Sequence, residues 1–272
     1  MVDYRIVKYL KYILWTLLIV VPCLVTILIY NDKITENSPV YYNQGVKFYN
    51  EGNYSDAYYN FSKIKWISPL YPMALYKQAK SAQKIGDYKT SALKYKLFLK
   101  KMPDSVFSIN ARLNLAKSYY YLKQYEQAKS EFEKLVEKID NDGIEEIFFL
   151  GLIEKNYDKQ KAADYFRRYL ITALRDKALN KYYISASAKE LADLGIELSN
   201  EDLQLIGIAF FKERRYKEAL EYLMKLPSDI CKDYVILANH YAGNKVIAKK
   251  LIESGITTYS KNEEEKKKWE EE

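Results

Sequence analysis

His240 is the only histidine of the chain and the first candidate for acid–base chemistry. It stands in the segment DYVILANHYAG, where an imidazole serves as a general base only if a nucleophile or an orienting acid lies beside it. The neighbouring sequence supplies neither group. We therefore interpret His240 as a packing residue of a helix.

Two pairs of adjacent acids, Glu145 with Glu146 and Glu264 with Glu265, do not form a catalytic couple, because consecutive helix positions face different directions. The sequence contains no phosphate-binding, dinucleotide-binding, nucleophile-elbow or zinc-protease motif. One histidine and two cysteines far apart in the chain are too few clustered ligands for a zinc site. We expect no catalytic residue, no cofactor and no metal, and hence no enzyme.

The composition favours a folded, helical protein. Of the 272 residues 49% are hydrophobic and 29% charged, which is enough apolar material for a core. Only 9 Gly and 6 Pro leave little material for the many turns of a β-sandwich. The net charge of +7 comes from interspersed signs without a basic stripe, so we expect no nucleic-acid partner.

Residues 13–30 read ILWTLLIVVPCLVTILIY, without one charged side chain. A helix of that length rises roughly 27 Å, close to the hydrocarbon thickness of a bilayer. Tyr12, Trp15 and Tyr30 stand near its ends, where aromatic rings prefer the headgroup level. The sequence therefore predicts a transmembrane helix. A cleavable signal peptide is the alternative, although the run is longer than usual and no small-residue cleavage site follows it.

Basic residues predict how this helix would be oriented. Arg5, Lys8 and Lys11 outnumber the acids on its amino-terminal side. The positive-inside rule then places residues 1–12 in the cytoplasm. After a linker at 31–37, the remaining chain would lie on the extracytoplasmic side, in the periplasm or outside the cell. We predict a single-pass membrane protein.

Small and aromatic residues recur with a period near 34 through the rest of the chain. The first three units show this pattern at Gly45, Phe48, Gly52, Tyr54, Ala57, Phe61 and Pro69; at Ala79, Ala82, Gly86, Tyr88, Ser91, Tyr95, Phe98 and Pro103; and at Leu115, Ala116, Tyr119, Tyr125, Ala128, Phe132 and Leu135. Small side chains let two antiparallel helices approach closely, and aromatic rings fill the space beside them. These units closely resemble tetratricopeptide repeats.

The resemblance implies an all-α fold, in which the transmembrane helix is followed by an α-solenoid of about six helix pairs over residues 38–260. We expect the pairs near residues 38–71, 72–105, 109–142, 144–177, 200–227 and 231–256, with an insertion from Ile171 to Leu198. A charged tail, residues 261–272, follows. The 28 tyrosines suit such an array because their rings pack while their hydroxyls reach polar groups.

The first helix of each pair lines the concave face of a solenoid, which often carries the binding site. Helical projection selects Tyr42, Asn43, Tyr49, Asn50, Tyr76, Lys77, Lys80, Lys84, Asn114, Lys117, Tyr120 and Tyr121. This set suits an extended peptide or a glycan strand. Tyr42 and Val46 stand where family members that bind a terminal carboxylate carry lysine and asparagine, so we do not transfer that specificity.

We interpret the chain as a membrane-anchored scaffold for protein–protein interactions in the cell envelope, with an unidentified protein or peptide as its partner. The alternative is a weaker resemblance to the non-catalytic solenoid of soluble-type lytic transglycosylases, which implies peptidoglycan as a partner. That family also carries a lysozyme-like catalytic domain, and we expect none within these residues.

Overall fold

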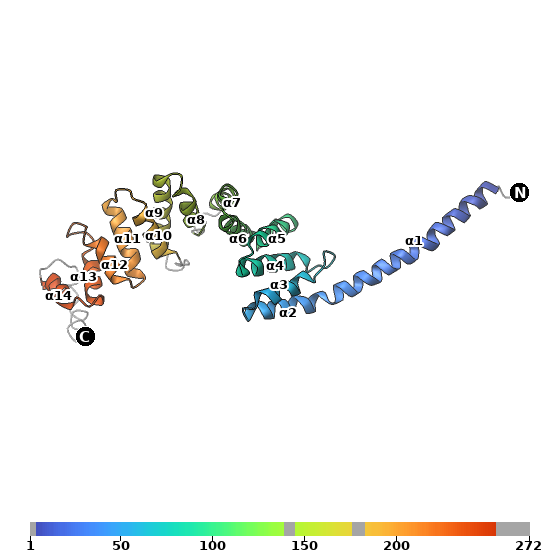
Figure 1. The fold of residues 1–272 in the computed structure, drawn as a ribbon, viewed down its shortest axis with the longest axis horizontal. Helices are drawn as coiled ribbons and strands as arrows, with labels where there is room; N and C mark the ends of the chain where they lie inside the picture. Colours follow the sequence, from blue (N-terminus) through green and yellow to red (C-terminus); the bar gives the residue numbers. More distant parts are fainter. Residues whose placement is uncertain (1–3, 139–144, 176–182, 254–272) are drawn as a thin grey trace. The chain divides into compact units, whose positions relative to one another are not determined.

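Every regular element that the structure describes is a helix (Figure 1). The structure is a computed structural model that describes residues 4–138, 145–175 and 183–253, without the side chains of 4–8, 10, 27–34 and 137–138. The helices of this part are α1 (Tyr4–Glu36), α2 (Ser38–Asn50), α3 (Tyr54–Ser62), α4 (Tyr71–Ile85), α5 (Tyr88–Lys101), α6 (Ser108–Tyr121), α7 (Tyr125–Lys138), α8 (Glu145–Glu154), α9 (Lys159–Arg175), α10 (Ile184–Asp193), α11 (Asn200–Lys212), α12 (Tyr216–Leu223), α13 (Lys232–Tyr241) and α14 (Lys245–Glu253). The predicted tail at 261–272 lies outside the described residues.

The chain divides into two compact units, Met1–Ala128 and Lys129–Glu272. In each unit, consecutive helices of a pair pack against each other, for example α4 with α5 and α11 with α12. The stretch that was expected to be an insertion contains α10, which packs on both α9 and α11. The predicted all-α repeat architecture is therefore confirmed for the described residues, whereas the exact limits of its pairs remain a prediction.

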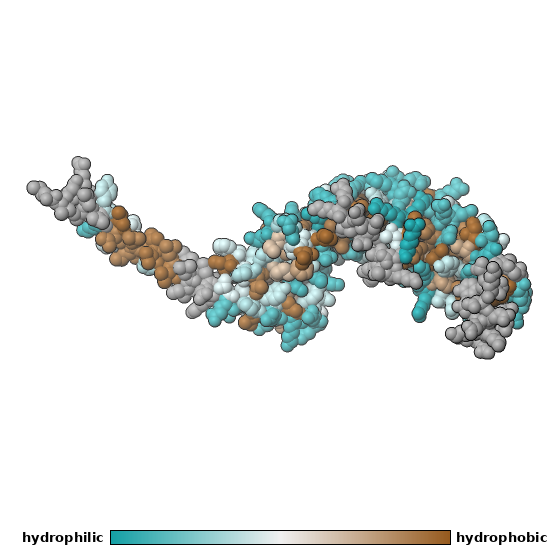
Figure 2. Space-filling model, turned by 180° about the vertical axis from the view of Figure 1, so that it is seen from behind, coloured by the Kyte–Doolittle hydropathy of each residue, from teal (hydrophilic) through white to brown (hydrophobic). Residues whose placement is uncertain are grey.

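The prediction of a transmembrane helix at 13–30, and with it the single-pass localisation, is wrong. Helix α1 carries a band of exposed apolar side chains (Figure 2). Among the described residues, no helix has an apolar stretch long enough to cross a membrane. The helix also continues through most of the predicted linker, since it ends at Glu36.

Three helix pairs are held together by a glycine that faces a large side chain. A Cβ added to Gly45 would lie 2.7 Å from the Phe61 ring, and one added to Gly151 would lie 2.6 Å from the Phe166 ring. A Cβ added to Gly207 would lie 2.5 Å from the Leu223 side chain. Both phenylalanine rings are fully buried. The two helices of each of these pairs thus approach more closely than any side chain larger than hydrogen would allow.

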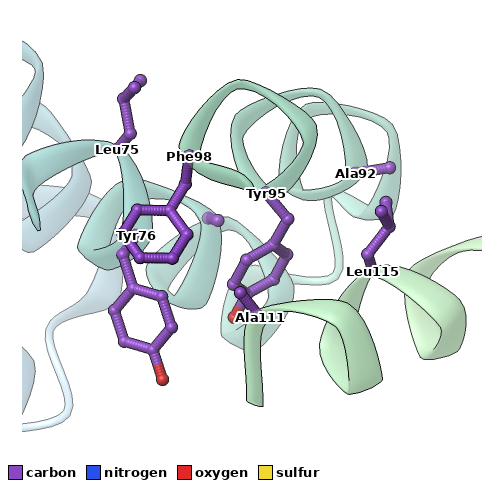
Figure 3. Packing of buried hydrophobic residues seen from close by; sticks show 8 residues of the cluster. Leu75, Tyr76, Ala92, Tyr95, Phe98, Ala111 and Leu115 are labelled. Atoms are coloured by element: carbon purple, nitrogen blue, oxygen red, sulfur yellow. The ribbon is translucent and has the colours of Figure 1, made fainter. Parts of the chain in front are cut away.

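Alanine takes the place of glycine in the second pair, where the core is built on aromatic rings. Ala79 and Tyr95 are both fully buried. Figure 3 shows the rings of Tyr76, Tyr95 and Phe98 gathered among α4, α5 and α6, with the Tyr76 ring centre 5.9 Å from Tyr95 and 5.3 Å from Phe98. Each pair therefore buries its apolar face against the next helix along the chain, as stacked repeats require.

The turn between the helices of a pair has the same geometry at five places. In each turn one residue has a left-handed backbone and donates its N–H to the carbonyl three residues earlier, while the next N–H reaches a carbonyl five residues back. These residues are Gly52 (φ 80°), Gly86 (φ 91°), Lys123 (φ 60°), Arg214 (φ 61°) and Gly243 (φ 91°). Lys123 and Arg214 carry a Cβ in this conformation, which costs about 1–2 kcal/mol each.

Buried ion pairs join helices of the second unit. Arg167 Nε donates to Asp202 Oδ1 at 2.6 Å and Arg167 Nη2 to Asp202 Oδ2 at 3.0 Å, which links α9 to α11. Burial raises the pKa of Asp202, but the hydrogen bonds from Arg167 and Ser199 outweigh burial and hold this pKa below its usual value. The buried carboxylate of Glu154 forms ion pairs with two lysines. Its Oε1 lies 2.7 Å from Lys129 Nζ and 3.2 Å from Lys161 Nζ.

We expect Gly45→Val to lower the free energy of unfolding by about 1–3 kcal/mol, because the new side chain must displace the buried Phe61 ring. Urea denaturation followed by circular dichroism measures the loss. Gln44→Val, at the exposed neighbouring position, is the control and should change stability by less than about 0.5 kcal/mol. Equal effects of the two substitutions would refute the close approach of α2 and α3.

We expect Lys123→Gly to raise the free energy of unfolding by about 0.5–1 kcal/mol, because glycine adopts a φ of 60° without steric cost. The gain is smaller than the strain removed, since glycine also has more freedom in the unfolded chain. Lys123→Ala is the matched control, because alanine removes the charge but keeps the Cβ. A gain as large for alanine as for glycine would mean that charge, and not backbone strain, is responsible.

Candidate functional site

The twelve residues that the sequence predicts for the concave face all belong to the first unit. We define the groove face as the surface of this unit formed by α2, α4 and α6, the first helices of its three pairs. Contacts link these helices side by side: Lys77 and Lys80 of α4 lie over the Tyr49 ring of α2, and Gln83 Nε2 of α4 donates to Asn114 O of α6 at 3.3 Å. The first helices of consecutive pairs therefore form one continuous surface.

Tyr49, Lys77 and Lys80 form the centre of the groove face, and we call them the Tyr49–lysine cluster. The ammonium nitrogens of Lys77 and Lys80 lie 5.9 Å and 5.4 Å from the centre of the Tyr49 ring. All three side chains are half-buried. The face of an aromatic ring attracts a cation by about 0.5–1 kcal/mol at such partly exposed sites. One ring thus positions two positive charges that stand one helical turn apart on α4.

The surroundings of the cluster change the pKa of two of its members. Burial, together with the charge of Lys80, lowers the pKa of Lys77. Burial also raises the pKa of Tyr49 to about 12, with smaller contributions from Tyr54 and Tyr76. At neutral pH the Tyr49 hydroxyl therefore keeps its proton and is a hydrogen-bond donor.

Polar residues extend the groove face on either side of the cluster. Asn43, Asn50 and Lys84 are exposed, so their side chains are accessible to a partner. Tyr42 is half-buried, because its ring packs edge-on against Phe61 at 5.6 Å, and burial raises its pKa. The groove face therefore carries asparagine amide groups as well as the charged lysines. Amide groups can form hydrogen bonds with a peptide backbone.

Tyr76 does not lie on the accessible surface, although helical projection placed it in the groove. Only 7% of this residue is exposed. Its ring packs against Tyr95, Phe98 and Phe107, the last at 5.3 Å, and Figure 3 shows it inside this core. The packing of α5 and of the residue before α6 buries Tyr76, and projection of a single helix does not include these neighbours.

Asn114 is engaged within the helices and is less accessible than its position suggested. Its side-chain Nδ2 donates to Asn110 O at 2.8 Å. Its backbone carbonyl oxygen accepts from Gln83 Nε2 at 3.3 Å and from Ser118 Oγ at 2.8 Å. Lys117 is half-buried. The amide of Asn114 is thus engaged within its own helix.

Tyr120 and Tyr121 belong to an aromatic cluster at the turn before α7, which sequence reasoning missed. Tyr121 stacks on Tyr88 with ring centres 4.6 Å apart. Tyr120 lies 5.5 Å from Tyr121 and 5.7 Å from Tyr125. Of the two predicted residues, Tyr121 is the more accessible, with 49% of its surface exposed.

The second unit contains an equivalent aromatic contact, in which Tyr216 stacks on Tyr241 at 5.0 Å. A sequence signal for these contacts exists: a tyrosine opens the second helix of several pairs, at Tyr54, Tyr88, Tyr125 and Tyr216. Each lies at the turn, where it meets an aromatic residue near the end of a first helix. This position accounts for part of the high tyrosine content.

The described residues offer little for catalysis or metal binding. His240 is half-buried and packs edge-on against Tyr241 at 5.3 Å. Within the described ranges, no group of three or more His, Cys, Asp or Glu side chains could hold a metal ion. Burial raises the pKa of Cys231, so its thiol is less ionised than usual.

Comparison with known proteins supports the repeat resemblance. The sequence model of the tetratricopeptide repeat matches residues 73–105 and 110–138, which contain α4 to α7. No curated protein matches this chain. The match includes two of the three pairs whose first helices form the groove face.

Similar solved structures include MamA of Desulfovibrio magneticus RS-1, with 16% identity, a TM-score of 0.48 and coverage of 70% of this chain and 92% of that chain. PilF of Pseudomonas aeruginosa matches with 18% identity, a TM-score of 0.46 and coverage of 71% of this chain and 91% of that chain. A tetratricopeptide repeat protein of Parabacteroides merdae matches with 14% identity, a TM-score of 0.45 and coverage of 80% of this chain and 98% of that chain. Likeness at this level says nothing about what this chain binds. Neither these structures nor the repeat match supports a lytic transglycosylase.

We expect Lys80→Gln to raise the pKa of Lys77 without restoring the ordinary value of 10.5, because burial, the larger cause of the lowering, remains. An NMR titration of 13C-labelled lysine side chains measures this pKa, and Lys77→Arg assigns the signal. Lys96→Gln, which removes an exposed lysine of α5, should leave the pKa of Lys77 unchanged. A pKa of Lys77 that does not respond to Lys80→Gln would show that the two ammonium groups are not neighbours.

Proposed function

We propose that this chain is a non-enzymatic scaffold of the tetratricopeptide type, which binds an extended segment of a partner protein along the groove face of its first unit. The observation that supports this most is the Tyr49–lysine cluster, in which Lys77 and Lys80 of one helix meet the ring of Tyr49 on the preceding first helix. Contacts between first helices place polar groups of different repeats on one surface, where a single ligand can touch several of them.

The chemistry of the groove face favours recognition over reaction. Lysines and asparagines donate hydrogen bonds to backbone and side-chain oxygens, and half-buried tyrosine rings supply flat contact area at low entropic cost. A nucleophile with an adjacent base, which covalent catalysis needs, is not among the twelve predicted residues. Interaction of the groove face with peptidoglycan, the alternative partner, has no observation among the described residues in its favour.

Substitution of Lys77, Lys80 and Lys117 together by glutamate should abolish capture of the partner and leave the melting temperature nearly unchanged, because all three side chains reach the surface. The test is a crosslinking pull-down with the tagged full-length chain from its own cells. A photoreactive residue at exposed Asn43 or Asn50 identifies what occupies the groove face.

Substitution of Lys89, Lys96 and Lys100 by glutamate is the matched control, because it changes the net charge equally at exposed positions of α5. Capture should persist in this variant. Unchanged capture by the groove variant, or the same loss in both variants, would place the binding site elsewhere.

A further inference from the structure

Positive charge is concentrated in the unit that carries the groove face. Residues 1–128 contain 18 Lys and Arg against 8 Asp and Glu, a net charge of +10, whereas residues 129–272 contain 25 against 28, a net charge of −3. The overall charge of +7 hides this difference. The partition matters because a surface of one sign attracts ligands of the opposite sign and raises their association rate.

The Tyr49–lysine cluster differs from the ion pairs of the second unit in what surrounds its basic side chains. In the second unit several have carboxylate partners, as in the contacts of Lys129 and Lys161 with Glu154 and of Arg167 with Asp202. At the Tyr49–lysine cluster, by contrast, the described residues place no carboxylate within 4.0 Å of either ammonium nitrogen, and their contact is the Tyr49 ring. The ring orients the two charges but does not neutralise them.

Two like charges held one turn apart repel each other, and partial burial reduces their hydration. The lowered pKa of Lys77 is consistent with both effects. A carboxylate placed between the two ammonium groups would relieve the repulsion and accept charge-assisted hydrogen bonds from both. The protonated hydroxyl of Tyr49 is a further donor at the same place.

We propose that Lys77 and Lys80 bind aspartate or glutamate side chains of the partner, so that the groove face selects an acidic, extended polypeptide segment. This rests on the proposed function and names the chemistry of its ligand. A polypeptide fits better than a phosphate polymer, because exposed amides at Asn43 and Asn50 flank the cluster and match backbone groups. The cluster has two lysines, whereas a phosphate polymer would be matched by a longer row of basic side chains.

The test is a fluorescence-anisotropy titration of the full-length chain with two labelled 12-residue peptides. One peptide alternates glutamate or aspartate with leucine and serine, and the other has the matching glutamines and asparagines. We expect the acidic peptide to bind at least tenfold more tightly. Lys77→Gln with Lys80→Gln should weaken its binding at least tenfold, whereas the control, Lys96→Gln with Lys100→Gln on α5, should change it less than twofold. Far-UV circular dichroism melts verify that both variants fold.

The outcomes separate this inference from the proposed function. If both peptides bind equally and both lose affinity in the Lys77 and Lys80 variant, the groove face binds peptides but the selection of acidic segments is refuted. If the two lysine variants lose affinity equally, or an oligonucleotide of the same charge binds more tightly than the acidic peptide, the surface attracts polyanions in general and the proposal fails. If neither peptide binds while the pull-down still depends on Lys77, Lys80 and Lys117, only the acidic ligand is refuted.

Discussion

The close approach of the two helices in each pair is the constraint on which the rest of this protein depends. Gly45 meets the Phe61 ring at a distance that leaves no space for a methyl group, and Gly151 repeats this contact with Phe166. Because the second helix is held so near, the next first helix can pack against it and lie beside the preceding first helix. The groove face is therefore a consequence of core packing.

Within the groove face, an aromatic ring takes the place that a carboxylate occupies elsewhere in the chain. Lys77 and Lys80 are oriented by Tyr49, whereas Arg167 of the second unit is neutralised by buried Asp202. A ring holds a cation weakly and leaves it available, while a buried ion pair is satisfied within the fold. Basic side chains are thus left available in the Tyr49–lysine cluster, whereas Arg167 is held in an ion pair within the second unit.

Tyrosine has three separate roles in the repeats. Tyr95 fills a core, where it is fully buried, and Tyr49 supports the lysines of the groove face. Tyr88 opens a second helix and stacks on Tyr121 of the following pair, so it links consecutive pairs at their turns.

The sequence by itself determined the helix pairs and the small residues at their contacts, because a period near 34 and the spacing of Gly45 from Phe61 are local properties of the chain. It also indicated which helices form the groove face. Only the tertiary structure decided that Tyr76 is buried and that Lys77 and Lys80 share one ring. The reason is physical: periodicity follows from neighbours along one helix, whereas burial and charge pairing depend on residues that are distant in the chain and meet only after folding.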